Sequence, residues 1–209
     1  MATKVDICNL ALAVLGDTAT VSSIDPPEGS AQADHCARFY GMTVNEVLSQ
    51  HNWSFALKRV RLSELVSAVE GDDDMHQYAL PADCLRVMRL YSASLGDKYC
   101  QYDIEMFFGQ RVIVTKVEDP WVIYVSSQVD ESAFPPLFTT CVVHRLASWL
   151  AGPLVTSSSG TEMALKQYEL YSLFLNRAIH ADAVQQHKKE QVTSRFLADH
   201  DGDMPDVFY

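Results

Sequence analysis

Three groups of side chains in the sequence have types and spacings that could bind a metal ion. The first is a set of alternating carboxylates, Asp199, Asp201 and Asp203, which is how an EF-hand calcium loop begins. That loop needs glycine at its sixth position, whereas Gly202 stands at the fourth. We therefore expect a solvated acidic segment here rather than a calcium site.

The other two groups are a Cys–His pair and an acidic run. Cys141 and His144 lie three residues apart on one predicted helix, but two ligands without further partners make a poor metal site, and core packing is favoured. The run EGDDD at residues 70–74 could chelate a cation, although a solvated loop is the favoured interpretation. The sequence therefore predicts no metal site and no cofactor.

Motifs of the familiar catalytic and nucleotide-binding classes are missing from the sequence. It contains no GxGxxG, no phosphate-binding GK[ST], no HExxH and no GxSxG. Asp83 is a candidate catalytic carboxylate, but no partner base lies near it in the sequence, so we interpret the LPAD stretch at residues 80–83 as a structural turn. We expect that the chain is not an enzyme.

Composition narrows the classes of partner. A formal net charge of −11 disfavours tight binding to nucleic acid, which depends on Lys and Arg neutralising phosphates. The 48% hydrophobic content is typical of a soluble globular protein, and no apolar run approaches the ~20 residues of a membrane helix, so we expect no membrane partner. The five cysteines are scattered without a CxxC pair, which favours reduced thiols in a cytoplasm.

The segment on which the rest of the chain is expected to pack spans residues 31–61. Its first part is predicted to be a long amphipathic helix capped by Ser30, because one apolar stripe recurs at spacings of three and four. That stripe consists of Ala33, Cys36, Tyr40, Thr43, Val44, Val47 and His51. After a break near Asn52, we expect Trp53 and Phe55 to anchor the chain against the first and last helices, before an extended basic run.

Three further helices are predicted around this segment. The first is capped by Thr3 with Asp6 and ends at Gly16. The second starts at Pro136 and is stopped by the Gly152-Pro153 pair, and the last starts at Thr161. Their expected inward stripes are Cys8, Ala11, Leu12 and Leu15 in the first helix, Phe138, Cys141, Val142, Arg145, Leu146 and Trp149 in the next, and Leu165, Tyr168, Ser172, Leu175 and Ile179 in the last.

The middle of the chain is predicted to form strands. Residues 62–69 are expected to add one or two helical turns, whereas residues 78–81, 85–90, 99–104, 111–117 and 121–129 have the alternation typical of strands. The predicted fold class is therefore α+β, a bundle of three to four helices with a small antiparallel sheet inserted mid-chain. We assign residues 1–74 and 130–190 to a helical domain, 75–129 to a β domain and 191–209 to a C-terminal tail.

Three short motifs resemble the tail tubular protein A family, the head-to-tail adaptors of short-tailed bacteriophages. They are CNLAL at residues 8–12, followed by Leu15-Gly16, then HNWSFA at 51–56, followed by Lys58-Arg59, and YALPADCLRV at 78–87. Their order and spacing make the resemblance fairly specific, and it covers about residues 4–185. The structural residues that it singles out are Trp53, Phe55, Tyr78, Leu80, Pro81, Asp83 and Arg86.

The resemblance implies a structural virion protein at the head–tail interface, assembled in the host cytoplasm. It implies self-association into a ring of about twelve subunits beneath the portal protein. The ring would extend the channel, through which double-stranded DNA passes without specific binding, and would dock the tail nozzle (tail tubular protein B-like) and in some phages tail fibres. The residues of the tail are not part of the family pattern.

A separate hypothesis concerns the tail, which has two apolar clusters separated by acidic residues. We expect it to be unstructured in the free subunit and to order against the portal, with the apolar residues as anchors. These anchors are Phe196, Leu197, Val207, Phe208 and Tyr209. The alternative is an unstructured end that only favours solubility.

Two other functional classes remain open at this point. One is a small soluble phage enzyme such as a hydrolase, which activity screening together with electron microscopy of the particle would separate from a ring-forming adaptor. The other is a scaffolding or partner-binding module that stays monomeric or dimeric, which mass measurement in the presence of purified portal would reveal.

Overall fold

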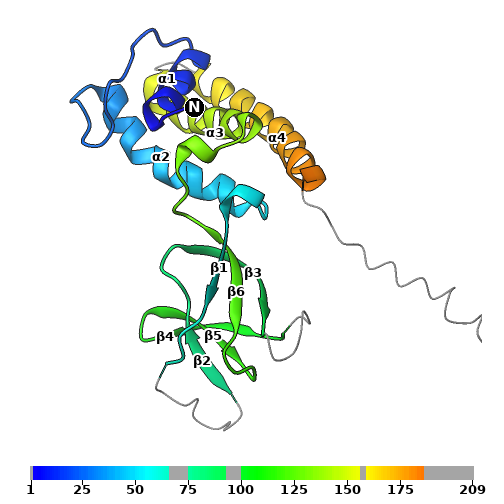
Figure 1. The fold of residues 1–209 in the computed structure, drawn as a ribbon. Helices are drawn as coiled ribbons and strands as arrows, with labels where there is room; N and C mark the ends of the chain where they lie inside the picture. Colours follow the sequence, from blue (N-terminus) through cyan, green and yellow to red (C-terminus); the bar gives the residue numbers. More distant parts are fainter. Residues whose placement is uncertain (1, 66–74, 93–99, 156–158, 186–209) are drawn as a thin grey trace, which may run out of the picture.

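The computed structural model describes residues 2–65, 75–92, 100–155 and 159–185 (Figure 1). Its helices are α1 Lys4–Val14, α2 Ala31–Ser49, α3 Pro136–Leu154 and α4 Ser159–Gln185. Its strands are β1 Leu57–Arg61, β2 His76–Ala79, β3 Cys84–Tyr91, β4 Asp103–Phe107, β5 Gln110–Thr115 and β6 Trp121–Ser126. Single 3-10 turns, Ser54–Ala56 and Glu131–Ala133, precede β1 and α3. In the part of the chain that is described, no helix is long and apolar enough to cross a membrane.

The four helices gather at one end of the molecule and the strands at the other (Figure 1). Helix α3 is central, because α1, α2 and α4 all pack against it. The core of this helical layer includes Trp53, Phe138, Leu146 and Leu150, all fully buried. At the start of α4, a Cβ on Gly160 would lie 2.6 Å from the Val155 carbonyl oxygen, so only glycine fits this close turn between α3 and α4.

The strands form two antiparallel three-stranded sheets. One has the order β1-β6-β3 and the other the order β2-β5-β4. The two sheets share a second core, which consists of Leu62, Tyr78, Leu80, Cys84, Leu90, Ile113, Val122 and Tyr124. A single bridge between Glu64 and Tyr78 connects the chain after β1 to β2 and so joins the sheets along one side. The α+β class predicted from the sequence is therefore confirmed.

Local signals in the sequence located the first two helices accurately. Thr3 and Asp6 form the expected reciprocal capping box, and Ser30 accepts a hydrogen bond from the Ala33 N–H. Gly16 has a φ of +82°, the left-handed conformation expected after a helix end. Except for His51, which is partly exposed, every residue of the predicted stripe of α2 is buried.

Several boundaries differ from the prediction, and the strand expected at 99–104 lies at Asp103–Phe107. Residues 62–65 are not helical, because Leu65 donates to the Gln77 carbonyl and Glu64 bridges to Tyr78 in an extended conformation. The sheet region begins at Leu57 and not after residue 74, since β1 pairs with β6. Helix α3 continues through Pro153 to Leu154, whereas we expected the Gly-Pro pair to end it.

The predicted inward stripe of α4 was wrong in its first half. Leu165 is 61% exposed and Tyr168 is exposed too, whereas the buried positions are Gly160, Gln167, Tyr171, Ala178 and Asp182. Two of the buried positions are polar, and each has a hydrogen-bond partner on another element. The spacing of hydrophobic residues cannot identify a buried helix face when some of the buried residues are polar and hydrogen-bonded to other elements. In α3, likewise, Trp149 is 37% exposed, because this helix packs on three sides and not along one stripe.

Several predictions fall outside the described residues. These are the acidic run at 70–74, the residues 66–69 of the expected helical turns, and the tail from 191 onward. The carboxylates at 199–203 and the five proposed portal anchors belong to that tail.

Candidate functional site

Of the three groups considered for metal binding, only the Cys141–His144 pair lies in the described residues, and both of its side chains are engaged in packing. Burial raises the pKa of the Cys141 thiol to about 12, so it is a neutral core group. His144 Nδ1 lies 2.7 Å from Gln167 Oε1, and its ring stacks on Phe174. Among the described residues, no three His, Cys, Asp or Glu side chains gather as a metal site would require.

The residues of the second and third motifs meet at the junction between the helical layer and the sheets. Lys58 Nζ donates to Asp83 Oδ2 at 2.8 Å, and an Arg86 guanidinium nitrogen donates to Asn52 Oδ1 at 2.6 Å. Each contact joins one residue near the end of α2 or in β1 to one residue at the start of β3. We call these four residues the motif junction. The sequence alone did not predict that they pair.

Asp83 is the most connected member of the motif junction. Besides Lys58, it accepts hydrogen bonds from Tyr124 Oη at 3.0 Å and Ser126 Oγ at 2.7 Å. Burial alone would raise its pKa, but the hydrogen bonds from Lys58, Ser126 and Tyr124 together hold that pKa below its ordinary value. The predicted turn is present, since Cys84 N–H donates to the Pro81 carbonyl. Asp83 therefore acts as a half-buried acceptor that fixes the start of β3.

Three other motif residues fill the core between the two sheets or border it. Tyr78 is buried and donates its hydroxyl to the Val117 carbonyl at 3.0 Å. Leu80 is buried beside it, and Pro81 is half-buried at the turn. In the first motif, the Asn9 side chain makes two hydrogen bonds with the backbone of Val21. Its Oδ1 accepts from the Val21 N–H at 2.7 Å and its Nδ2 donates to the Val21 carbonyl at 3.0 Å, which fixes the connector that leads to α2.

Trp53 and Phe55 anchor the end of α2 with ring contacts to α3, a helix that the prediction of the first and last helices did not name. Trp53 is 1% exposed, and its indole N–H donates to the Val47 carbonyl at 3.0 Å. Both rings make edge contacts with Phe138 of α3, at centroid distances of 5.0 Å and 4.9 Å. Phe138 of the central helix α3 therefore supplies the ring contacts at the break, and Trp53 also lines a cavity together with Ala178 and Asp182 of α4, the last helix.

Asp182 connects the last described turn of α4 to the same break. Its carboxylate accepts from Ser54 Oγ at 2.6 Å and from the Ser54 backbone N–H at 3.1 Å, and it lies 3.2 Å from His51 Nε2. Asp182 is buried. This role could not be predicted from the sequence, because an aspartate near the end of a helix is normally expected to be solvated.

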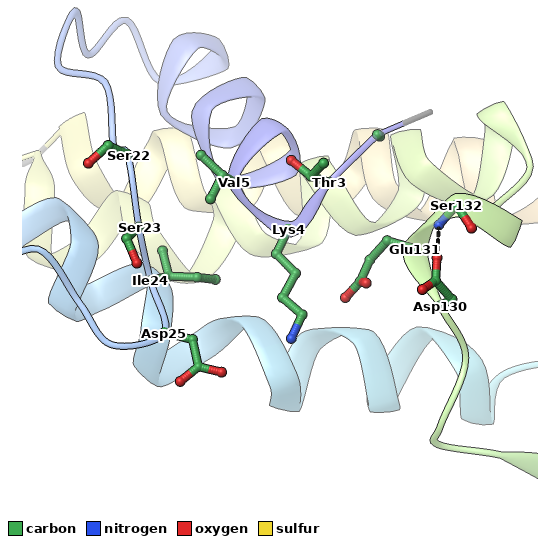
Figure 2. A pocket seen from close by; sticks show the side chains of 11 residues that line it. Thr3, Lys4, Val5, Ser22, Ser23, Ile24, Asp25, Asp130, Glu131 and Ser132 are labelled. Carbon is green, nitrogen blue, oxygen red and sulfur yellow. Dashed lines mark hydrogen bonds between the residues drawn. The ribbon is translucent and has the colours of Figure 1, made fainter.

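Two cavities border these elements. The first, of about 200 Å³, is mostly apolar and lies between the start of α3 and the end of α4, with Trp53, Phe138, Ala178 and Asp182 among its lining residues. The second, of about 470 Å³, is polar and open, between the N-terminus of α1, the 22–25 connector and the turn before α3 (Figure 2).

The polar cavity contains one lysine among carboxylates. Lys4 extends into it between Asp25 and Glu131 (Figure 2). Glu131 accepts from the Tyr40 hydroxyl at 3.1 Å, and Asp130 accepts from the Ser132 backbone N–H at 2.8 Å. These carboxylates are used by the protein's own donors, and we assign the cavity no ligand.

A row of aromatic rings and one arginine crosses the surface of the helical layer. Phe39 of α2 stacks on Trp149 of α3 at 6.1 Å, and the Arg145 guanidinium lies 4.4 Å from the Trp149 ring centroid and 5.1 Å from that of Tyr168 in α4. Arg145 is held by Glu46, which accepts from its Nε at 2.9 Å. We call Phe39, Arg145, Trp149, Leu165 and Tyr168 the helical patch. Trp, Tyr and Arg are the residues enriched at the energetic centres of protein interfaces.

A second exposed apolar surface lies on the β4–β5 hairpin. Ile104, Met106 and Phe108 are 48%, 66% and 95% exposed. Phe108 has a φ of +45° at the turn, a conformation that is uncommon for a non-glycine residue. We call these three residues the hairpin patch. The sequence indicated the turn but not the exposure, because a Phe-Phe pair is normally expected in a core.

No family model and no curated protein matches this chain.

Proposed function

We propose that the chain is a head-to-tail adaptor of a short-tailed bacteriophage, a non-enzymatic structural protein that assembles as a ring beneath the portal. In that role it extends the channel for double-stranded DNA and docks the tail nozzle. The proposal rests on the three motifs and on their use in the fold. Trp53 and Tyr78 are buried anchors and Phe55 is half-buried, while Asp83 and Arg86 bind residues of the preceding motif.

The observation that carries the assembly half of the proposal is the presence of two unlike apolar surfaces on one chain. The helical patch lies on the helical layer and the hairpin patch lies on the sheets. They are different surfaces, so a contact between them would join two unlike faces of neighbouring subunits. A contact between unlike surfaces is heterologous, and it produces a closed ring when the rotation between neighbours closes. Large apolar side chains grouped on the surface mark an interaction site more often than isolated ones do.

The experiment measures particle mass with and without the portal protein of the same phage. We expect a monomer or small oligomer in dilute solution, because subunits of net charge −11 repel one another, and a ring on the portal, which raises the local concentration. Electron microscopy of the complex would count the subunits. A chain that stays monomeric with portal present would favour the scaffolding or partner-binding module instead.

Surface variants make this test specific. Phe108→Asp and Leu165→Asp should leave the subunit folded, since both side chains are exposed, but should abolish ring formation. Leu173→Asp is the matched control, because Leu173 is 48% exposed on α4 and belongs to neither patch. Loss of the ring in the control, or its retention in both patch variants, would remove the support that the two surfaces give.

A further inference from the structure

The outer face of the β1-β6-β3 sheet carries a concentration of arginines in an otherwise acidic protein. The strand register places Arg59 of β1 and Arg89 of β3 on either side of Ile123 in β6. Residues that oppose one another across strands share one face of a sheet, so the two guanidinium groups lie on the same surface. Ile123 is nevertheless buried, which fits coverage by the two arginine stems.

Aromatic rings lie in the next row of the same face. Arg61, Trp121 and Tyr91 oppose one another, and the rings of Tyr91 and Trp121 stack at 6.5 Å. The guanidinium carbons of Arg59 and Arg89 lie 5.5 Å and 5.7 Å from the Tyr91 centroid. We call Arg59, Arg61, Arg89, Tyr91 and Trp121 the basic face. It suits a ligand that combines negative charge with aromatic or apolar groups.

The chain itself contains one segment of that chemistry. Residues 199–209 read DHDGDMPDVFY, with four aspartates, two aromatic residues and no Lys or Arg. The basic face has three arginines, and Asp119 pairs with one of them, Arg61, at 2.7 Å on the exposed surface. The segment and the face therefore carry opposite charges, and both contain aromatic rings.

The position of α4 brings this segment within reach. Asp182 binds Ser54, which precedes Arg59 by five residues, a path of at most about 17 Å at the rise of a strand. The C-terminal end of α4 also lies on the side of the molecule where β3 is (Figure 1). Thirteen residues lie between Gln185 and Asp199, and the fourteen Cα–Cα steps from one to the other can span about 46–50 Å when extended.

We propose that residues 199–209 dock on the basic face of their own chain in the free protein. The aspartates lie against the guanidinium groups of Arg59 and Arg89, and the aromatic end of the segment lies against Trp121. The proposal differs from the expectation drawn from the sequence alone, in which these residues stay unstructured until a partner binds. It does not depend on the adaptor function, because it requires neither a ring nor a portal.

The competing occupant is single-stranded nucleic acid, since sheet faces with aromatic rings and arginines also bind stacked bases. The net charge of −11 and the pairing of Arg61 with Asp119 weigh against it, because affinity for a phosphate backbone depends on the number of phosphates that Lys and Arg neutralise. A nucleic-acid ligand is therefore an outcome that the experiment must be able to detect.

The first measurement is fluorine NMR of the full chain and of a chain ending at residue 198, both labelled with fluorotryptophan. The protein has three tryptophans, Trp53, Trp121 and Trp149, so each resonance reports one location. We expect truncation, or high salt applied to the full chain, to shift the Trp121 resonance and to leave the other two in place. Identical Trp121 resonances in the two chains at low salt would show that the segment does not occupy the face.

The second measurement is binding of a synthetic peptide of residues 199–209 to the truncated chain. Arg59→Glu combined with Arg89→Glu should weaken binding by about tenfold or more, because two attractive charge pairs become repulsive. The matched control is Lys166→Glu with Arg177→Glu, which reverses two exposed cations on α4. A peptide with its four aspartates replaced by asparagine should bind about tenfold more weakly as well.

A deoxythymidine oligonucleotide tested on both chains decides between the two occupants. Under the proposal, any oligonucleotide binding to the truncated chain is reduced in the full chain, because the acidic segment competes for the same arginines. Equal oligonucleotide binding by both chains, with no binding of the peptide, would overturn the proposal. Equal loss of peptide binding in the α4 control would also overturn it, since the attraction would then be a nonspecific effect of net charge.

Discussion

Lys58 Nζ lies 2.8 Å from Asp83 Oδ2, across 25 residues of sequence. This contact and the one between Arg86 and Asn52 join the end of the helical layer to the start of β3. The orientation of the sheets relative to the helices is thus held by paired polar groups as well as by the continuous chain.

The two partners of this ion pair should contribute unequally to stability. Asp83→Ala leaves the Tyr124 and Ser126 hydroxyls without their acceptor, so we expect a loss of about 1–3 kcal/mol. Lys58 has a 43% exposed side chain, and Lys58→Met should cost less than about 1 kcal/mol. Urea unfolding of both variants checks this. Equal losses would mean that the ion pair, and not the hydroxyl network, dominates.

Asp83 should also make the protein sensitive to acid. Its folded pKa is held below the ordinary value of 3.8, so the stabilisation is fully present above that value and is lost as pH falls through the folded pKa. Asp83→Asn should therefore be less stable than the parent at pH 7, and the difference should shrink below about pH 4. Urea unfolding at pH 7, 5, 4 and 3 measures it. A difference that grows on acidification would contradict the assigned direction.

Trp53 should be the most costly tryptophan to remove. It is 1% exposed and contacts Phe138 and the Val47 carbonyl, so Trp53→Ala should lower the free energy of unfolding by about 3–5 kcal/mol. Trp149→Ala, at a 37% exposed position on α3, is the matched control and should cost about 1–2 kcal/mol. Thermal or urea unfolding of both variants compares them. An unchanged melting temperature in the Trp53 variant would refute its anchoring role.

Asp182 should stabilise the junction from the end of α4. Asp182→Ala removes the acceptor of the Ser54 hydroxyl and backbone N–H, and we expect a loss of about 1–3 kcal/mol. Glu169→Ala, on an exposed part of the same helix, should change stability by no more than about 0.5 kcal/mol. Hydrogen exchange should show faster opening of residues 54–56 in the first variant only. Unchanged exchange there would mean that α4 does not hold this turn.

The sequence by itself determined the local elements of this protein. The caps at Thr3 and Ser30, the left-handed Gly16 and the apolar stripe of α2 depend on interactions within a few residues, which a sequence pattern records directly. The strands after Tyr78 and the turn at Phe108-Gly109 follow from the same kind of local preference. For this reason the α+β class could be predicted without the structure.

Contacts between distant segments were decided only by the tertiary structure. The inward face of α4 depends on Gln167 and Asp182, whose partners are 23 residues away at His144 and 128 away at Ser54. The spacing of hydrophobic residues in the sequence does not show which polar residues have a hydrogen-bond partner on another element. The pairing of Lys58 with Asp83, the grouping of the arginines on the outer face of the β1-β6-β3 sheet and the exposure of Phe108 all depend on how sheets and helices are placed in space. Hydrophobic spacing specifies which residues leave water, whereas the identity of each polar partner is specified only when the elements pack.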